Sequence, residues 1–346
     1  MGCKTERLDF MTDRSTLLSA FIRTSGWGNA NRLTVAGDAS NRRYERLTAT
    51  SGATIILMDA PADKGEDVRP FVAIANHLRG IGLSAPEILH SDIENGFLLI
   101  EDLGDGLFKQ VIARDESLEL PLYEASVDVL TVLHAAPMPT LAPYDTATMT
   151  NFAARAYEFY LSALTGAQNT PEQAEFEKRM AALLAPLANG PQVLIQRDYH
   201  AENLLWMPER SGAARVGLLD FQDAMSGHAA YDLVSILQDA RRDVPPAMEA
   251  AMINRYLAQN PQDEDAFRAA YAILGVQRNL RIVGAFAKLC TVLGKPRYIN
   301  LIPRVWEFVE RNLAHPALAP VASHIRNTLP FPTPEALALL KSKCAT

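Results

Sequence analysis

The chain has little cysteine, no long apolar run and no excess of positive charge. Its three cysteines, Cys3, Cys290 and Cys344, are far apart in the sequence and form no C-x-x-C pair. We therefore expect neither a disulfide framework nor a structural zinc site, and a reducing cytoplasm fits this composition. No run of about 18 apolar residues occurs, so no membrane span is expected, and the N-terminus lacks the apolar core of a secretion signal.

The charge balance is acidic, with 33 Lys and Arg against 40 Asp and Glu and a formal net charge of -7. Nucleic-acid-binding proteins normally carry a basic excess, so nucleic acid is not an expected partner. Nothing in the sequence indicates a membrane surface or an obligate protein partner. An anionic substrate must then be held by local devices, such as a metal ion or backbone amides.

What the sequence does contain is ordinary globular material, with 48% hydrophobic and 21% charged residues. Apolar residues at helical spacing predict a helix over 12–24 and another from Pro70 to about Gly80. Short β-branched and aromatic runs separated by turn residues predict five strands in the first hundred residues. Their sequences are LTVAG, YERLTA, TIILMD, EILHSD and GFLLIED.

From about Leu107 onward the pattern is mainly helical. Helical periodicity covers 117–135, 150–163, 172–188, 246–259, 264–294 and 298–313, and an island of short strands over 192–223 interrupts it. This order of elements predicts an α+β fold rather than a repeating βα one. We expect a small N-lobe of residues 1–103, a hinge near Glu101 to Gly104, and a helical C-lobe of residues 104–346 that contains the catalytic loop and the acceptor site.

The strand island contains the residues best suited to chemistry. The apolar strand VLIQ leads into the loop RDYHAEN, where Asp198 and Asn203 are five residues apart, and Asp220 ends a later apolar strand, VGLLD. One carboxylate can act as a base, while carboxylate and amide oxygens are ligands that Mg²⁺ prefers. Phosphoryl transfer needs this combination, because a base orients the attacking hydroxyl and the metal neutralises charge on the nucleotide phosphates.

Two segments of the island resemble motifs of eukaryotic-type kinases. RDYHAEN is similar to their catalytic loop R-D-x-x-x-x-N, and LLDFQD is similar to their metal-binding segment. Asp232 follows Asp220 by only twelve residues, which leaves no room for the activation segment of a protein kinase. With D-x-H-x-x-N and D-F-x-x-A-x-x-G-x-x-x-Y-D-L, the chain resembles the aminoglycoside phosphotransferase and choline kinase superfamily. Within it, GDASNRRY, ILMDAP, GFLLIEDLGD and LDFQDA are most similar to the anomeric kinases of N-acetylmuramate and N-acetylglucosamine.

This resemblance implies a protein-kinase-like bilobal fold and assigns roles to particular residues. Asp198 would be the catalytic base, and Asn203 and Asp220 would hold Mg²⁺. The other implied roles are nucleotide binding (Ser40, Asn41, Arg43, Glu101, Leu103), substrate binding (His200, Asp223) and structural support (Arg197, Asp232).

The chain departs from the kinase pattern in three places. Gln196 stands where the family usually has His, and the loop GDASNRR contains one glycine rather than a glycine-rich run. Met58 or Asp59 in the third strand occupies the usual position of the phosphate-contacting Lys. Because arginine can contact phosphate with two hydrogen bonds, we expect Arg43, with Arg42 as second choice, to supply the missing cation.

The resemblance implies an enzyme that uses ATP and Mg²⁺ to phosphorylate a small sugar acceptor, as in cytoplasmic cell-wall sugar recycling. Two alternatives stay open: a kinase for another hydroxylated acceptor (an aminoglycoside, choline or homoserine), and a nucleotide-sensing pseudokinase, which the missing third-strand Lys would explain. The basic stretch with Arg278, Arg281 and Lys288 lies on a predicted helix. Such a stretch is usually a solvated face, but it could also receive an anionic acceptor group such as the lactyl carboxylate of a sugar.

Overall fold

The structure is a computed structural model that describes residues 5–35, 41–168 and 170–345. Its contacts divide the chain into two compact units. Unit 1 consists of the residues up to Gly106 together with Leu205–Asp223, and unit 2 consists of Leu107–Leu204 together with the residues from Ala224 onward.

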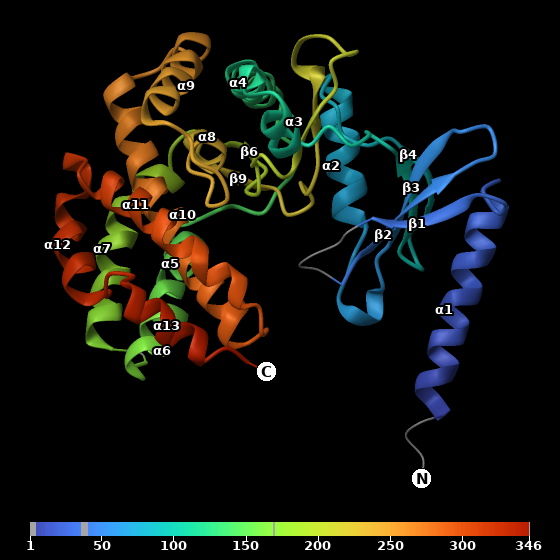
Figure 1. Cartoon of the computed structure of the whole chain (residues 1–346). Coiled ribbons are helices and arrows are strands. Elements are labelled where there is room, and N and C mark those ends of the chain that lie inside the picture. The colour runs from blue at the N-terminus through green and yellow to red at the C-terminus, as the bar shows by residue number, and fades with distance from the viewer. Residues whose placement is uncertain (1–4, 36–40, 169, 346) are drawn as a thin grey trace. The chain divides into compact units, whose positions relative to one another are not determined.

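Unit 1 is built on a five-stranded antiparallel sheet with the strand order β1-β2-β3-β5-β4 (Figure 1). All five predicted strands are present. Helix α1 begins earlier than predicted and precedes the sheet, while α2 connects β3 to β4. The bounds are α1 (Thr5–Thr24), β1 (Asn31–Val35), β2 (Arg43–Thr48), β3 (Thr54–Asp59), α2 (Arg69–Gly80), β4 (Ile88–Asp92) and β5 (Phe97–Glu101).

Alternation along the strands gives the sheet two different faces. Leu47 of β2 pairs with Ile55 of β3, and both belong to an apolar cluster with Leu57 and Leu99 that Ile22 of α1 joins. Burying such side chains contributes roughly 1.5–3 kcal/mol each. The residues in between, including Tyr44 and its partner Met58, must therefore lie on the opposite face of the sheet.

Residues 205–223 belong to unit 1 because of hydrogen bonds that the sequence does not reveal. Strand β8 (Val216–Leu218) pairs with β7 (Leu204–Trp206), and the Leu218 N–H donates to the Ser84 carbonyl over 2.7 Å. Arg210 donates to the Ser84 hydroxyl over 2.7 Å and to Glu101 over 2.5 Å. We had expected this segment in the C-lobe; the functional division at residues 103 and 104 stays a prediction.

Unit 2 is mainly helical and contains one small antiparallel pair, β6 and β9. The six helical segments predicted after Leu107 are present, and α5 continues through a π-helical turn over Ala156–Leu161 into α6. The bounds are α3 (Phe108–Arg114), α4 (Glu119–Ala135), α5 (Thr146–Arg155), α6 (Ser162–Thr165), α7 (Pro171–Ala188), β6 (Val193–Ile195), β9 (Met225–Gly227), α8 (Ala230–Leu237), α9 (Pro246–Gln259), α10 (Glu264–Thr291), α11 (Ile302–Leu313), α12 (Ala319–Thr328) and α13 (Pro334–Ser342).

Helix α10 is the central element of unit 2 and contacts α5, α8 and α11. The Asp263 side chain caps its first turn by accepting the Ala266 N–H over 2.8 Å, as acidic N-cap residues do. Gly284 lets α5 approach closely, because a Cβ there would collide with the backbone of Arg155. This approach matters for the site, since Arg155 and Arg281 project from these two helices.

One expectation about the cysteines was wrong. Cys290, near the end of α10, forms a disulfide with Cys344, and their Cα atoms are 4.6 Å apart. The pairing depends on tertiary structure, because α13 lies against α10 and the Ala345 N–H donates to the Cys290 carbonyl over 3.0 Å. A separation of 54 residues in the sequence gives no indication of such proximity.

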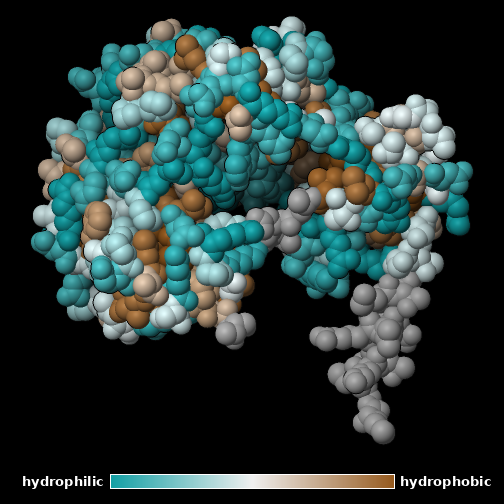
Figure 2. Space-filling view, viewed as in Figure 1, coloured by the Kyte–Doolittle hydropathy of each residue, from teal (hydrophilic) through white to brown (hydrophobic). Residues whose placement is uncertain are grey.

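The surface is mostly hydrophilic on the face that Figure 2 shows, with hydrophobic side chains in separate patches. The large exposed apolar residues come from distant parts of the chain, such as Leu33 and Phe331, which is normal for a globular protein. Among the described residues, no helix is both long enough and apolar enough to cross a membrane.

Candidate active site

The predicted catalytic loop lies in unit 2, directly after β6, and a buried carboxylate holds it. Asp232 in the first turn of α8 has no exposed surface. One carboxylate oxygen accepts the Gln196 N–H over 2.6 Å, and the other accepts the Arg197 N–H over 2.9 Å. Burial raises the pKa of Asp232 to about 7, against the opposing effect of these two N–H donors. Asp232 therefore braces the backbone just before Asp198.

The backbone of this loop adopts a conformation that non-glycine residues rarely occupy. Arg197 has a φ of +71°, in the left-handed region, although it carries a Cβ. Such a residue costs about 1–3 kcal/mol and persists only where its surroundings enforce it, as the bonds from Asp232 do here. The turn presents Asp198 at the loop surface, with 30% of its side chain exposed.

Asp198 is surrounded by positive charge. Arg281 of α10 donates to its Oδ1 over 3.2 Å, and Arg281 also donates to the Tyr231 hydroxyl over 2.9 Å. Burial acts to raise the pKa of Asp198, but the charges of Arg281, His200 and Arg278 outweigh it and lower the pKa below its ordinary value. The carboxylate is therefore ionised at neutral pH, which is the state that a base must have.

Asn203 and His200 are connected within the same loop. The Asn203 Nδ2 donates to the Asp198 carbonyl over 2.8 Å, and it lies 3.3 Å from the His200 Nε2. These contacts fix the plane of the amide and hence the direction of its oxygen. His200 is only 7% exposed, and burial lowers its pKa. In this structure His200 orients Asn203, while its predicted contact with an acceptor stays a prediction.

Asp220 lies in unit 1, at the end of β8, and its carboxylate is exposed. It also has a left-handed backbone, with a φ of +58°, and its Oδ1 accepts the Gln222 amide over 2.7 Å. The next residue, Phe221, is buried and stacks on Phe71 of α2 with 4.9 Å between ring centroids. Packing of Phe221 thus turns Asp220 outward. The joint binding of one ion by Asp220 and Asn203 stays a prediction, as does the predicted acceptor contact of Asp223.

The residues expected at the nucleotide phosphates belong to unit 1. Ser40 and the three residues before it in the loop 37–44 fall outside the described residues. Asn41 donates from its backbone N–H to Glu66 over 2.9 Å and from its side chain to the Lys64 carbonyl over 3.1 Å. Met58, one of the two residues predicted to stand at the position of the usual Lys, is completely buried, and the other, Asp59, accepts a hydrogen bond from Arg14. The third strand therefore presents no cation on this face of the sheet.

Arg42 and Arg43 differ in their surroundings. Arg43 pairs with Asp59 across β2 and β3, on the face of the sheet where Asp59 binds Arg14 of α1. Arg42 forms an ion pair with Glu66 over 2.8 Å, and it interacts with the Tyr44 hydroxyl. Burial raises the pKa of Tyr44, and the negative charge of Asp220 adds to this increase. Arg42, our second choice, thus interacts with a tyrosine that lies within electrostatic range of the predicted metal ligand, whereas Arg43 lies on the face of the sheet towards α1.

The predicted adenine-binding segment follows β5. The Glu101 N–H donates to the Glu87 carbonyl over 2.9 Å, and the Glu101 carboxylate accepts hydrogen bonds from Arg210 and Arg79. By contrast, the Leu103 N–H makes no hydrogen bond to the part of the chain that the structure describes. This N–H is therefore available for the predicted hydrogen bond between Leu103 and the adenine of the nucleotide.

Sequence reasoning missed Arg155 and Phe152, which lie on α5 close to the Asp198 loop. Their segment was recognised as a helix, but its periodicity does not reveal which helix it faces. The π-helical turn that starts at Ala156 is also invisible in the sequence. The only available signal was the presence of an arginine within a mostly apolar stretch, ARAYEFYL, whose one other charged residue is Glu158.

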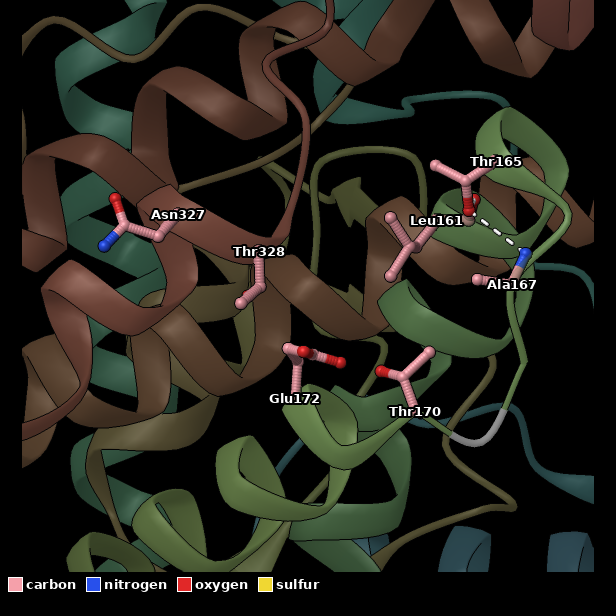
Figure 3. A pocket seen from close by; sticks show the side chains of 7 residues that line it. All are labelled: Leu161, Thr165, Ala167, Thr170, Glu172, Asn327 and Thr328. Atoms are coloured by element: carbon pink, nitrogen blue, oxygen red, sulfur yellow. Dashed lines mark hydrogen bonds between the residues drawn. The ribbon is translucent and has the colours of Figure 1, made fainter.

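A separate pocket in unit 2 has a volume of about 320 Å³ and contains none of the predicted site residues. Figure 3 shows its lining at the ends of α6, α7 and α12, including Thr165, Glu172 and Thr328. Thr165 accepts the Ala167 N–H over 3.1 Å there. We assign no catalytic role to this pocket.

Comparison with solved structures identifies the fold. A choline/ethanolamine kinase family protein from Mesorhizobium loti superimposes with a TM-score of 0.59 at 15% identity, covering 92% of this chain and 99% of the other. A putative aminoglycoside phosphotransferase from Ralstonia eutropha gives a TM-score of 0.60 at 14% identity, covering 86% and 98%. The predicted α+β class and protein-kinase-like fold are therefore confirmed.

Sequence comparison identifies the family. The model of the phosphotransferase enzyme family matches residues 32–270. The chain is 39% identical to an N-acetylmuramate/N-acetylglucosamine kinase from Caulobacter vibrioides, covering 93% of this chain and 98% of the relative. It is 35% identical to a protein of the same description from Pseudomonas aeruginosa, covering 88% and 91%. The chain belongs to the phosphotransferase enzyme family, as its kinase motifs predicted.

Proposed function

We propose that the chain is an ATP- and Mg²⁺-dependent kinase that phosphorylates N-acetylmuramate and N-acetylglucosamine at the anomeric hydroxyl. The observation that carries this proposal is the Asp198 loop, braced by Asp232, in a chain that is 39% identical to a curated kinase of these sugars over nearly its full length. The cytoplasm, which supplies ATP, Mg²⁺ and recycled cell-wall sugars, is the proposed location.

In the proposed reaction, Asp198 accepts a hydrogen bond from the anomeric hydroxyl and orients its oxygen towards the γ-phosphorus of ATP. The new bond joins that oxygen to phosphorus, the bond from phosphorus to the β–γ bridging oxygen breaks, and ADP leaves. The hydroxyl proton passes to the Asp198 carboxylate. The lowered pKa of Asp198 supports this role, because an ionised carboxylate is available to accept the proton.

The donor set suits Mg²⁺, which prefers carboxylate and amide oxygens. Asp220 would supply a carboxylate and Asn203 an amide oxygen whose direction is fixed by the bonds of its Nδ2. When bound, the ion would neutralise charge on the ATP phosphates. Leu103 would contact the adenine, while Asn41 and either Arg42 or Arg43 would lie at the phosphates.

Transfer of ³²P from γ-labelled ATP to a panel of acceptors tests the proposal. The panel contains N-acetylmuramate, N-acetylglucosamine, choline, homoserine and kanamycin, and 1-O-methyl-N-acetylglucosamine serves as a matched control whose anomeric oxygen is blocked. We expect labelling of the two free sugars and none of the blocked one. Labelling of the blocked sugar would place the phosphate elsewhere, and exclusive labelling of another acceptor would refute the proposed substrate.

The charge around Asp198 already argues against a polycationic acceptor. Arg281 and Arg278 lie within electrostatic range of its carboxylate, the group that would orient the acceptor hydroxyl. Like charges repel, so an aminoglycoside would be unfavourable beside these groups. This observation supports a neutral or anionic acceptor.

A further inference from the structure

Three arginines gather around one aromatic ring beside the Asp198 loop. The guanidinium carbons of Arg155, Arg197 and Arg281 lie 4.4, 5.4 and 5.8 Å from the centroid of Phe152. A phenyl ring has only two faces, so at least two of these cations share one. The arginines come from α5, the catalytic loop and α10, and all of them belong to unit 2.

The cluster contains more positive than negative charge. Arg281 pairs with Asp198, but Arg155 makes no hydrogen bond or ion pair with any described residue. The buried Arg278 donates to the Ser235 hydroxyl over 2.7 Å, while its Nε and Nη1 have no partner among the described residues. Burial and the nearby charge of Arg281 lower the pKa of Arg155. Arg281 is paired with Asp198, and Arg155 lies within range of the charge of Glu158, but the Arg155 guanidinium itself forms no ion pair with the described residues, so it is suited to bind an anion beside Arg281.

The helices hold these arginines in place without help from a ligand. Gly284 brings α10 against the backbone of Arg155, so α5 and α10 cannot separate or rotate without breaking a tight contact. The π-helical turn begins immediately after Arg155 and changes the direction in which the following residues project. Such turns are frequent at functional sites. The contact at Gly284 fixes the backbones that carry Arg155 and Arg281, so binding a carboxylate there requires little rearrangement of the helices.

We propose that Arg155, together with Arg281, binds the carboxylate of the acceptor sugar and thereby sets the preference for an acidic over a neutral N-acetylhexosamine. This inference rests on the proposed function. N-acetylmuramate carries a lactyl carboxylate, which N-acetylglucosamine lacks, so the two proposed substrates differ in the group that this cluster would recognise. A planar guanidinium can bind a carboxylate with two parallel hydrogen bonds, and an acid at this position relieves the repulsion between the arginines.

The test compares N-acetylmuramate with its methyl ester, which keeps the shape of the lactyl group and removes its charge. The parent protein should have a kcat/KM at least tenfold higher for the acid than for the ester. In Arg155→Gln this preference should fall at least tenfold, mainly through a higher KM for the acid. Arg155→Lys, which keeps the charge without the planar fork, should lose less. Arg268→Gln, on the same helix as Arg281 and paired with Glu264, is the matched control.

The outcomes separate this inference from the proposed function. Equal losses for the acid, the ester and N-acetylglucosamine, or an unchanged preference in Arg155→Gln, would overturn the carboxylate subsite. If Arg155→Gln does not fold, an unchanged preference in Arg155→Lys would overturn it instead. If the parent turns over none of the three sugars, the proposed function fails. The melting temperature then still tests the subsite. N-acetylmuramate should raise the melting temperature of the parent more than its methyl ester does, and this difference should be absent in Arg155→Gln.

Discussion

The loop that presents Asp198 and the turn that presents Asp220 share a backbone device but differ in their electrostatic surroundings. Each contains a non-glycine residue in the left-handed region, with a φ of +71° at Arg197 and +58° at Asp220. Each is held by a buried neighbour, which is Asp232 in the first case and Phe221 in the second. Asp198 faces several arginines, whereas Asp220 is exposed and accepts a hydrogen bond from a neutral amide.

This contrast matches two different tasks. A base must have a fixed direction and be ionised, and the charge of Arg281 serves both needs at Asp198. A ligand for Mg²⁺ must admit an ion that keeps several water molecules and contacts phosphate, so it needs an open approach. The left-handed conformations of Arg197 and Asp220 cost about 1–3 kcal/mol each. In both places the chain turns sharply after a strand, and the turn presents a carboxylate at the surface.

The largest expected effect comes from removing the proposed base, Asp198. Asp198→Asn should lower the turnover of N-acetylglucosamine by about 10³-fold, because positioned acid–base groups contribute about 10²–10⁴-fold. Nucleotide affinity and thermal stability should change little. Steady-state kinetics and calorimetric titration with ADP and Mg²⁺ measure both effects. The exposed Asp243, which pairs with Arg304, provides the control variant Asp243→Asn. Near-parental turnover in Asp198→Asn would refute its role.

The second prediction concerns Asp220, the exposed carboxylate, and its proposed role as a ligand of Mg²⁺. In Asp220→Asn, loss of the metal carboxylate should weaken binding of ATP in the presence of Mg²⁺ by about 10²-fold, and binding with EDTA should change little, because the charge that Asp220 supplies acts through the ion. Titration calorimetry with and without Mg²⁺ measures the difference. Equal affinities of parent and variant in Mg²⁺ would contradict the metal role and remove the contrast between the two carboxylates.

The sequence predicted the elements better than it predicted which distant segments contact one another, and the roles of the site residues stay predictions. The strands and long helices carry strong periodicity, and the Asp198 loop follows a recognisable motif between two apolar strands. Contacts between distant segments leave no such pattern. The approach of α5 to α10 depends on Gly284, which reads in the sequence as one glycine within a helix, and so Arg155 was not recognised.

Two other differences have the same origin. The Cys290–Cys344 disulfide depends on the packing of α13 against α10, and the assignment of residues 205–223 to unit 1 depends on the bond from Leu218 to Ser84. Strand register also decides the surroundings of Arg43, because a shift of one residue exchanges the two faces of a strand. Spacing along the chain indicates which residues are suited to chemistry, and tertiary structure decides which of them meet.

A smaller effect, on the KM for ATP, should distinguish Arg42 from Arg43 in unit 1. Arg42→Gln should raise the KM for ATP about tenfold, since a charge-assisted hydrogen bond to phosphate contributes about 1.5–3 kcal/mol, part of which the ion pair with Glu66 offsets. Arg43→Gln, on the face towards α1, is the matched comparison and should change the KM by less than about twofold. A larger effect for Arg43→Gln would restore our first choice and place the phosphates on the other side of β2.

The smallest effect should come from Arg281→Gln, assayed with neutral N-acetylglucosamine so that recognition of a carboxylate plays no part. Arg281 lowers the pKa of Asp198, so its removal should raise that pKa. Because the reaction needs the ionised carboxylate, the acid limb of the kcat/KM profile should move to higher pH. Near pH 7 the loss should stay below about tenfold, since a carboxyl with an ordinary pKa is still ionised there. Arg268→Gln should leave the acid limb in place. If Arg281→Gln also leaves it in place, positive charge does not keep Asp198 ionised, and the electrostatic contrast with Asp220 has no catalytic meaning.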